Sequence, residues 1–259
     1  MRTNMLPKKE PVAPKAKTTK KSKKEAKKVD MVIAFDTTGS MSSYIGDVKK
    51  RVMELIPTLF EDNPNLQLGI VAFGDYCDMT SRNNFGNAYQ CLPLSTDIAK
   101  IQKFVENARN TGGGDSDEFY ELVIKKINEE TDWRPDARHA VMLIADCAPH
   151  SVGYSYSDIV NNAQIDWREE AEKAKELGIE YDTCSIHGDR YPWYKELAEI
   201  TGGVYSEFQS SGNTSEYIKV ANTYRSGLAT ADAYMASSVS LAASNPEMSK
   251  VYATYAKSL

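Results

Sequence analysis

Apolar residues follow two alternating patterns along the chain. Short continuous apolar runs, as in strands covered on both faces, predict strands at residues 29–35, 66–73, 139–145, 179–186 and 204–208, with a short edge strand at 89–94. Apolar residues three and four positions apart predict helices at residues 45–59, 98–105, 119–127, 159–177, 193–200 and 217–224. Alternating strands and helices are typical of α/β proteins. We therefore expect a doubly wound, mainly parallel sheet with helices on both faces.

The same pattern divides the 259 residues into three parts. Residues 29–227 contain all the predicted strands and are expected to form one domain. Residues 1–28 are expected to be a disordered Lys-rich tail, and the Ala/Ser-rich residues 228–259 a helical extension or a second tail. No stretch approaches the roughly 20 apolar residues that a membrane-spanning helix needs.

Charge is distributed unevenly between these parts. Residues 1–30 hold eleven basic and three acidic residues, a net charge of +8, whereas the whole chain carries −5. Such a tail is suited to contact nucleic acid, an anionic membrane surface or an acidic partner, or to act as a nuclear address. The alternative is an arm that only solubilises the chain or lies on its acidic domain.

Other features of the sequence give expectations for the location of the protein and for the roles of its cysteines, its histidines and two further aspartates. The Lys-rich N-terminus has no apolar segment behind it, so we expect a soluble, intracellular and cytoplasmic protein, or a nuclear one in a eukaryotic host. The four cysteines are too few and too scattered for a disulfide scaffold and are expected to be small buried thiols. Three widely separated histidines, His139, His150 and His187, are expected in loops or the core rather than as metal ligands. Asp75 and Asp78 are expected in a solvated turn.

Three polar clusters lie where ligands gather in parallel sheets. Residues 36–42 (DTTGSMS) follow the first strand, residues 111–118 (TGGGDSDE) form a Gly-rich loop before a helix, and Asp146 follows the strand at 139–145. Because the carboxyl ends of parallel strands meet at one edge of the sheet, we expect the clusters to lie together. Their carboxylate and hydroxyl oxygens favour hard cations such as Mg²⁺, Mn²⁺ or Ca²⁺.

The spacing of residues in the first cluster suggests that their side chains bind one cation together. Side chains two positions apart in an extended chain point the same way, so Asp36, Thr38 and Ser40 are expected to converge. Gly39 permits a tight turn between them. Hydroxyls are weak, neutral ligands, so a cation held here would stay electrophilic and keep a position for a carboxylate from outside.

The order of these motifs resembles the von Willebrand factor A domain family with its metal-ion-dependent adhesion site. A strand followed by D-x-T-x-S, a Gly-rich loop with Asp, and a later strand followed by Asp occur in the family's order. Residues 181–188 (YDTCSIHG) and 197–205 (LAEITGGVY) resemble its last strand–helix–strand unit. The resemblance covers residues 29–225 and implies a Rossmann-like fold and a metal-dependent protein-binding module.

The resemblance also implies the metal ligands. Thr38 and Ser40 would bind the cation through their hydroxyls, and Asp36 directly or through water. The carboxylate of the third loop falls on Asp146.

The second loop departs from the family pattern. The family normally has a threonine ligand there, whereas this chain has Asp115 in that place. A carboxylate would bind the cation more tightly but lower the positive charge that attracts an acidic partner. Thr111 is the alternative ligand, and an N-terminal helix cap is the alternative role for residues 115–118.

Three functions follow from these residues. The first is a non-enzymatic module whose Mg²⁺, or Mn²⁺ or Ca²⁺, takes a carboxylate from an acidic residue of a partner protein. The second is a metal-dependent phosphohydrolase with Asp36 as nucleophile, although Thr38 stands where such enzymes place a second acid. The third is a nucleic-acid-associated adaptor that binds through the basic tail. We expect the first, with no catalytic residue and no organic cofactor.

Overall fold

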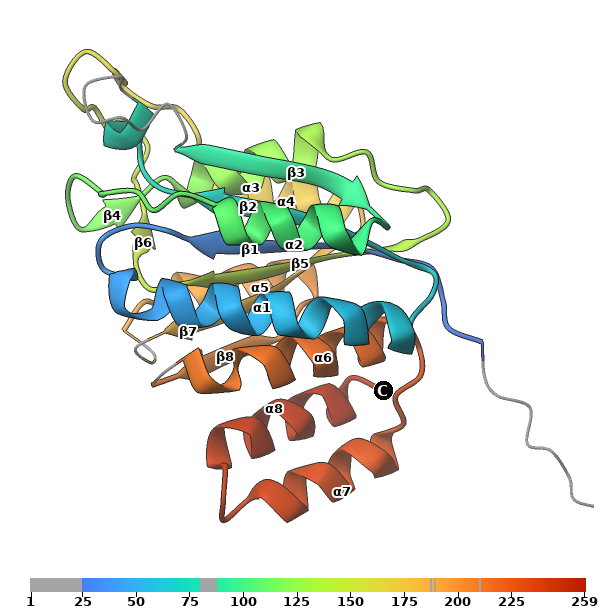
Figure 1. Ribbon diagram of the computed structural model, residues 1–259. Coiled ribbons are helices and arrows are strands. Elements are labelled where there is room, and N and C mark those ends of the chain that lie inside the picture. Colours follow the sequence, from blue (N-terminus) through green and yellow to red (C-terminus); the bar gives the residue numbers. More distant parts are fainter. Residues whose placement is uncertain (1–24, 80–87, 187, 189, 210) are drawn as a thin grey trace, which may run out of the picture.

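The computed structural model describes residues 25–259 apart from 80–87, 187, 189 and 210. Six strands form a central sheet in the order β3-β2-β1-β5-β7-β8 (Figure 1). They are β1 (Val29–Asp36), β2 (Leu66–Phe73), β3 (Tyr89–Ser95), β5 (Arg138–Ala145), β7 (Ile179–Ile186) and β8 (Tyr205–Phe208). Neighbouring strands are parallel except β2 and β3, which are antiparallel. The predicted mainly parallel α/β sheet is therefore confirmed.

Helices cover both faces of the sheet (Figure 1). One face is covered by α1 (Ser42–Asp62), α2 (Ile98–Asn107) and α6 (Thr214–Arg225), and the other by α3 (Tyr120–Glu130), α4 (Trp167–Glu176) and α5 (Trp193–Thr201). Each helix turns an apolar stripe toward the sheet, as Val48, Val52 and Ile56 of α1 show by their complete burial. Because both faces are covered, every residue of β1 is buried.

The start of α4 differs from the prediction. The apolar spacing predicts a helix over residues 159–177, but α4 begins at Trp167. The Asp166 side chain accepts a hydrogen bond from Arg168 N at 2.9 Å and caps the helix there. Before the cap, Tyr156 and Val160 form an isolated antiparallel bridge, which holds that segment in a loop.

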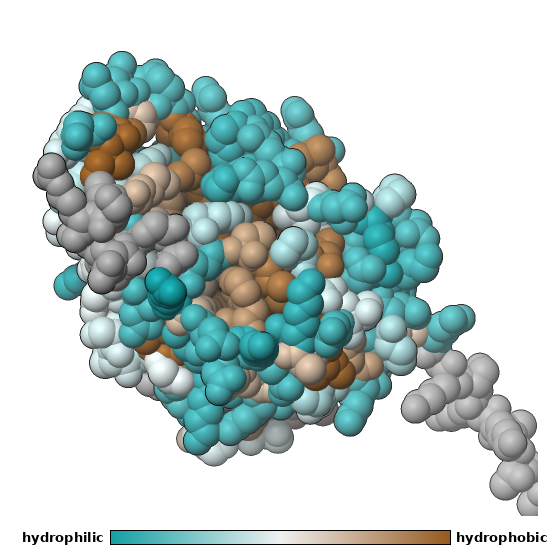
Figure 2. Space-filling view, turned by 45° about the horizontal axis from the view of Figure 1, so that its top comes forward, coloured by the Kyte–Doolittle hydropathy of each residue, from teal (hydrophilic) through white to brown (hydrophobic). Residues whose placement is uncertain are grey.

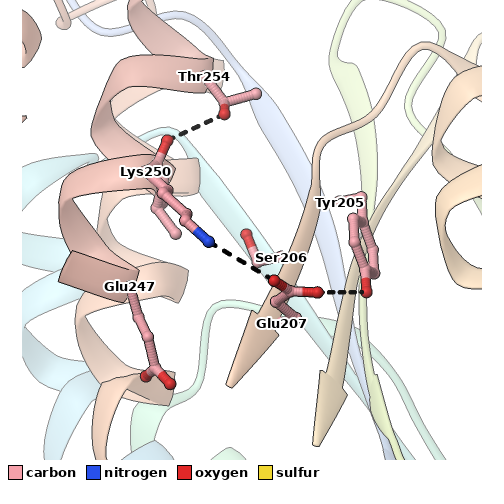
Figure 3. Close-up of a pocket in the computed structure, with 7 residues that line it drawn as sticks. Tyr205, Ser206, Glu207, Glu247, Lys250 and Thr254 are labelled. Atoms are coloured by element: carbon pink, nitrogen blue, oxygen red, sulfur yellow. Dashed lines mark hydrogen bonds and ion pairs between the residues drawn. The ribbon is translucent and has the colours of Figure 1, made fainter. Parts of the chain in front are cut away.

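The C-terminal segment forms a pair of helices, α7 (Ala231–Leu241) and α8 (Pro246–Lys257). Tyr255 is fully buried and Met248 nearly so, because α8 packs on α6 and β8. A small cavity lies between α8 and β8, where Lys250 Nζ is 3.7 Å from Glu207 Oε1 (Figure 3). The sequence predicted a helical extension or a tail here, and the structure has helices that pack on the domain.

The N-terminal segment meets the domain just before β1. Ala26 O accepts a hydrogen bond from Asn65 Nδ2 at 2.9 Å, and Lys27 N donates to Ser226 O at 3.0 Å. Residues 1–24, which make up most of the predicted tail, lie outside the described residues. The boundary of the tail therefore stays a prediction.

The edge strand β3 borders a hollow of about 270 Å³ lined by apolar residues that include Val71, Leu92 and Leu94. A view with this side turned forward shows hydrophobic surface in the middle of the face, ringed by hydrophilic residues (Figure 2). Cys91 on β3 is exposed, contrary to the expectation of buried thiols, because edge strands have an uncovered side. The other three cysteines are buried, and none of the four forms a disulfide bond.

Candidate metal centre

The end of β1 carries a chain of hydrogen-bonded oxygens. The Asp36 carboxylate is fully buried, and its Oδ1 accepts hydrogen bonds from Thr38 N and Thr38 Oγ1, both at 2.7 Å. Thr38 Oγ1 lies 3.2 Å from Ser40 Oγ. The structure therefore brings together the three side chains whose spacing predicted convergence. Asp36 is at the buried end, and Ser40 is exposed.

Asp146 joins this chain because β5 is the parallel neighbour of β1, so the two strands end side by side. Ser40 Oγ donates to Asp146 Oδ1 at 3.0 Å. Tyr120 OH donates to the other oxygen of Asp36 at 2.5 Å and accepts a hydrogen bond from Cys147 N at 3.3 Å. Tyr120 thus fixes the orientation of the Asp36 carboxylate from the first turn of α3.

Close backbone packing joins the Gly-rich loop to residues 36–42, the segment that follows β1. Gly39 N donates to Gly112 O at 3.1 Å, and a Cβ at Gly39 would lie only 2.9 Å from that oxygen. Gly113 has a φ of +72°, and a Cβ there would lie 2.8 Å from Glu118 Oε1. Glycine at these positions therefore lets the loop turn and brings Glu118 toward Thr38.

Glu118 is the site residue that sequence reasoning missed. Its side chain is buried, and its Oε2 has no hydrogen-bond partner among the described residues. Burial, followed by the negative charge of Asp36, raises the pKa of Glu118 to about 10, against a smaller lowering by a hydrogen bond from Thr38. The sequence offered one signal, because three acidic residues follow the glycines closely. Of these three, the sequence analysis chose Asp115 as the metal ligand.

Asp115 belongs to a different group of side chains. Its Oδ2 accepts a hydrogen bond from Tyr154 OH at 2.8 Å, and it lies with Asp75 and His150. Thr111, the alternative ligand, has its Oγ1 2.9 Å from Thr37 Oγ1. The helix-cap alternative is not observed, because α3 begins without a side-chain cap. Glu118, rather than Asp115, is the second-loop carboxylate beside Thr38.

Asp78 organises the Gly-rich loop, and the predicted solvated turn is wrong. Asp75 and Asp78 are both buried. The Asp78 carboxylate accepts hydrogen bonds from the backbone N–H groups of Asp75 at 3.1 Å, Gly112 at 2.9 Å and Gly113 at 3.1 Å. These donors satisfy the buried carboxylate. Two of them come from a distant loop, and a local pattern of polar residues does not reveal such partners.

Replacing Asp78 with alanine is expected to weaken cation binding by about tenfold, because three loop amides lose their acceptor and Glu118 loses its fixed position. Calorimetric titration of Mg²⁺ or Mn²⁺ measures the change. Asp97→Ala is the matched control, since Asp97 also accepts a backbone hydrogen bond, from Lys100 N at 3.0 Å, but caps α2. Equal affinities in the two variants would contradict this role for Asp78.

The donor set fits a hard divalent cation. It consists of carboxylate and hydroxyl oxygens only, which favours Mg²⁺, Mn²⁺ or Ca²⁺. Burial, and then the charge of Asp146, raises the pKa of Asp36 to about 7. A cation would offset the repulsion between these carboxylates and would take up the unpaired oxygen of Glu118. The exposed side of Ser40 leaves an approach from solvent.

A sequence match agrees with this architecture. Residues 30–223 match the family model described as von Willebrand factor type A domain. The chain belongs to this family. The resemblance inferred from the motifs is thereby confirmed at the level of the family. Von Willebrand factor A domains are generally protein-interaction modules, usually non-enzymatic, and typically bind a divalent metal.

Curated relatives are much longer than this chain. Alpha-protein kinase vwkA of Dictyostelium discoideum is 28% identical over 142 residues, which are 53% of this chain and 21% of the kinase. A protein of Acanthamoeba polyphaga mimivirus named "Putative ariadne-like RING finger protein R811" is 22% identical over 185 residues, 68% of this chain and 18% of that protein. The chain spans about a fifth of the length of each.

Solved structures share the fold. The conserved hypothetical protein BatB from Bacteroides thetaiotaomicron superposes with a TM-score of 0.52 at 16% identity, over 78% of this chain and 100% of its own. The pilus adhesin SpaC from Lactobacillus rhamnosus GG, in its open conformation, gives a TM-score of 0.56 at 13% identity, over 78% of this chain and 30% of its own. At these identities the likeness concerns the fold alone. None of the helices in the described part of the chain has the length and apolar character needed to span a membrane.

Proposed function

We propose that this domain is a divalent-cation-dependent protein-binding module. Its cation would take a carboxylate from an acidic residue of a partner protein as its last ligand. The all-oxygen donor set suits Mg²⁺, Mn²⁺ or Ca²⁺, and we propose Mg²⁺ as the cation. The residues that would hold it are Asp36, Thr38, Ser40, Glu118 and Asp146.

The observation that carries this proposal is the continuous chain of oxygens from buried Asp36 to Asp146, open to solvent at Ser40. Two of its members are neutral hydroxyls, which neutralise none of the cation's charge. The carboxylate of Glu118 would lower the positive charge that remains on the site, so the partner's oxygen would be held by a coordination bond at the open solvent side rather than by a strong net positive charge. When bound, the cation would supply one coordination bond to that oxygen.

The state of Asp36 supports a binding role over phosphohydrolysis. Both of its oxygens accept hydrogen bonds, from Thr38 and Tyr120, and the side chain is completely buried. A nucleophile needs an oxygen that reaches the substrate. Asp36 is instead held as an orienting and charge-bearing group.

Selection from a displayed peptide library tests the proposal. In Mg²⁺ or Mn²⁺, we expect the domain to retain peptides that share an Asp or Glu, and a chelator to release them. Changing that acid to its amide should abolish binding, and Ser40→Ala in the domain should weaken it. Ser43→Ala is the matched control, because Ser43 is an exposed serine in the first turn of α1. Binders that survive the chelator, or that need no acidic residue, would overturn the proposal.

A further inference from the structure

A second group of metal-ligating side chains lies outside the Asp36 site. It consists of Asp75 after β2, Asp115 in the Gly-rich loop and His150 after β6 (Ala148–Pro149), and each offers a ligand atom within 4.8 Å of the others. Asp75 Oδ1 is 2.7 Å from His150 Nε2. These segments are far apart in the sequence, and β6 pairs in parallel with β4 (Asp117–Glu118) at the edge of the sheet where the loops gather (Figure 1).

The group has an unsatisfied buried oxygen. Asp75 is completely buried, and its Oδ2 has no hydrogen-bond partner among the described residues. Leaving a buried carboxylate oxygen unpaired costs free energy that a cation would recover.

Neighbouring groups hold the ligands in position. The His150 ring stacks on Tyr154 with centroids 3.6 Å apart and planes inclined by 19°, and His150 N donates to Glu121 Oε2 at 3.2 Å. Tyr154 OH donates to Asp115 Oδ2. Such outer contacts fix the orientation of metal ligands. An open cavity of about 500 Å³, lined by Asp115, His150 and Tyr154 among others, gives access from solvent.

We propose that Asp75, Asp115 and His150 form a second cation site that prefers Zn²⁺ to Mg²⁺. An imidazole nitrogen favours Zn²⁺ and other transition metals, whereas the all-oxygen Asp36 site favours Mg²⁺. Three protein ligands leave a further position for water. The proposal uses residues other than those of the proposed function and does not depend on it. Because Asp115 and Glu118 share one loop, Zn²⁺ at this site would also steady the loop that carries Glu118.

Titration of Zn²⁺ into the full chain, held in saturating Mg²⁺, tests this site. We expect one Zn²⁺ per chain, bound at least about tenfold more weakly by Asp115→Asn and by His150→Gln. Asp158→Asn and His139→Gln are the matched controls, since Asp158 is an exposed acid of a nearby loop and His139 bonds to Arg134 O away from the cluster. Both controls should bind Zn²⁺ as the unmodified chain does.

Zinc-edge X-ray absorption on the same complex identifies the ligands. We expect oxygen and nitrogen neighbours with an imidazole contribution that His150→Gln removes. Sulfur neighbours, wild-type affinity in both ligand variants, or no Zn²⁺ uptake in Mg²⁺ would each overturn the proposal. Asp36→Asn separates the two sites, because it should lose Mg²⁺ binding and keep Zn²⁺ binding. Thermal melts confirm that each variant is folded.

Discussion

Replacing Asp36 with alanine is expected to weaken Mg²⁺ or Mn²⁺ binding by about 100-fold or more. The substitution removes the buried carboxylate and also the acceptor that orients Thr38 N and Oγ1. It leaves Tyr120 OH without the partner that it has at 2.5 Å. Calorimetric titration of each cation measures the loss.

Two further variants separate the loss of a ligand from the loss of the fold. Asp36→Asn keeps the size of the side chain and an acceptor for Thr38, so it should fold and still lose most of the cation affinity. Ser40→Ala removes an exposed hydroxyl and is expected to cost about tenfold, whereas Ser43→Ala should cost nothing. A folded Asp36→Asn protein with unchanged affinity would exclude the site.

Replacing Arg225 with alanine is expected to lower the free energy of unfolding by about 3–5 kcal/mol. Arg225 lies at the end of α6 and is almost fully buried. Its Nη2 is 2.7 Å from Asp182 Oδ1 on β7, and it also pairs with Glu180. Without Arg225, the fully buried Asp182, whose pKa burial already raises to about 7, would lose its cationic partner. Urea denaturation followed by circular dichroism measures the change.

Comparison with an exposed ion pair tests whether burial causes the large expected loss in the free energy of unfolding. Lys195 and Glu199 lie 3.7 Å apart on α5, with both side chains mostly exposed, so Lys195→Ala should cost less than about 1 kcal/mol. The double variant Arg225→Met, Asp182→Asn removes both charges and should regain part of the stability lost in Arg225→Ala. Equal costs for Arg225→Ala and Lys195→Ala would show that the buried pair is not structurally important.

Much of the architecture was predictable because its signals are local. The apolar run at residues 29–35 has the form of a strand covered on both faces, and β1 is buried throughout. The spacing of Asp36, Thr38 and Ser40 predicted that their side chains converge, and they form a hydrogen-bonded chain. The start of α4 was wrong by several residues, because the Asp166 cap outweighs the apolar spacing before it.

The sequence by itself determined the strands of the central sheet, most of the helices and the oxygens at the strand ends, because periodicity and strand termini depend on neighbouring residues. Only the tertiary structure decided which carboxylates meet. Glu118 faces Thr38, whereas Asp115, three residues earlier, joins Asp75 and His150. The path of the Gly-rich loop separates them, and that path is fixed by contacts between distant segments, such as Gly39 N to Gly112 O. Burial of a loop carboxylate depends on such contacts and has no periodic signal in the sequence.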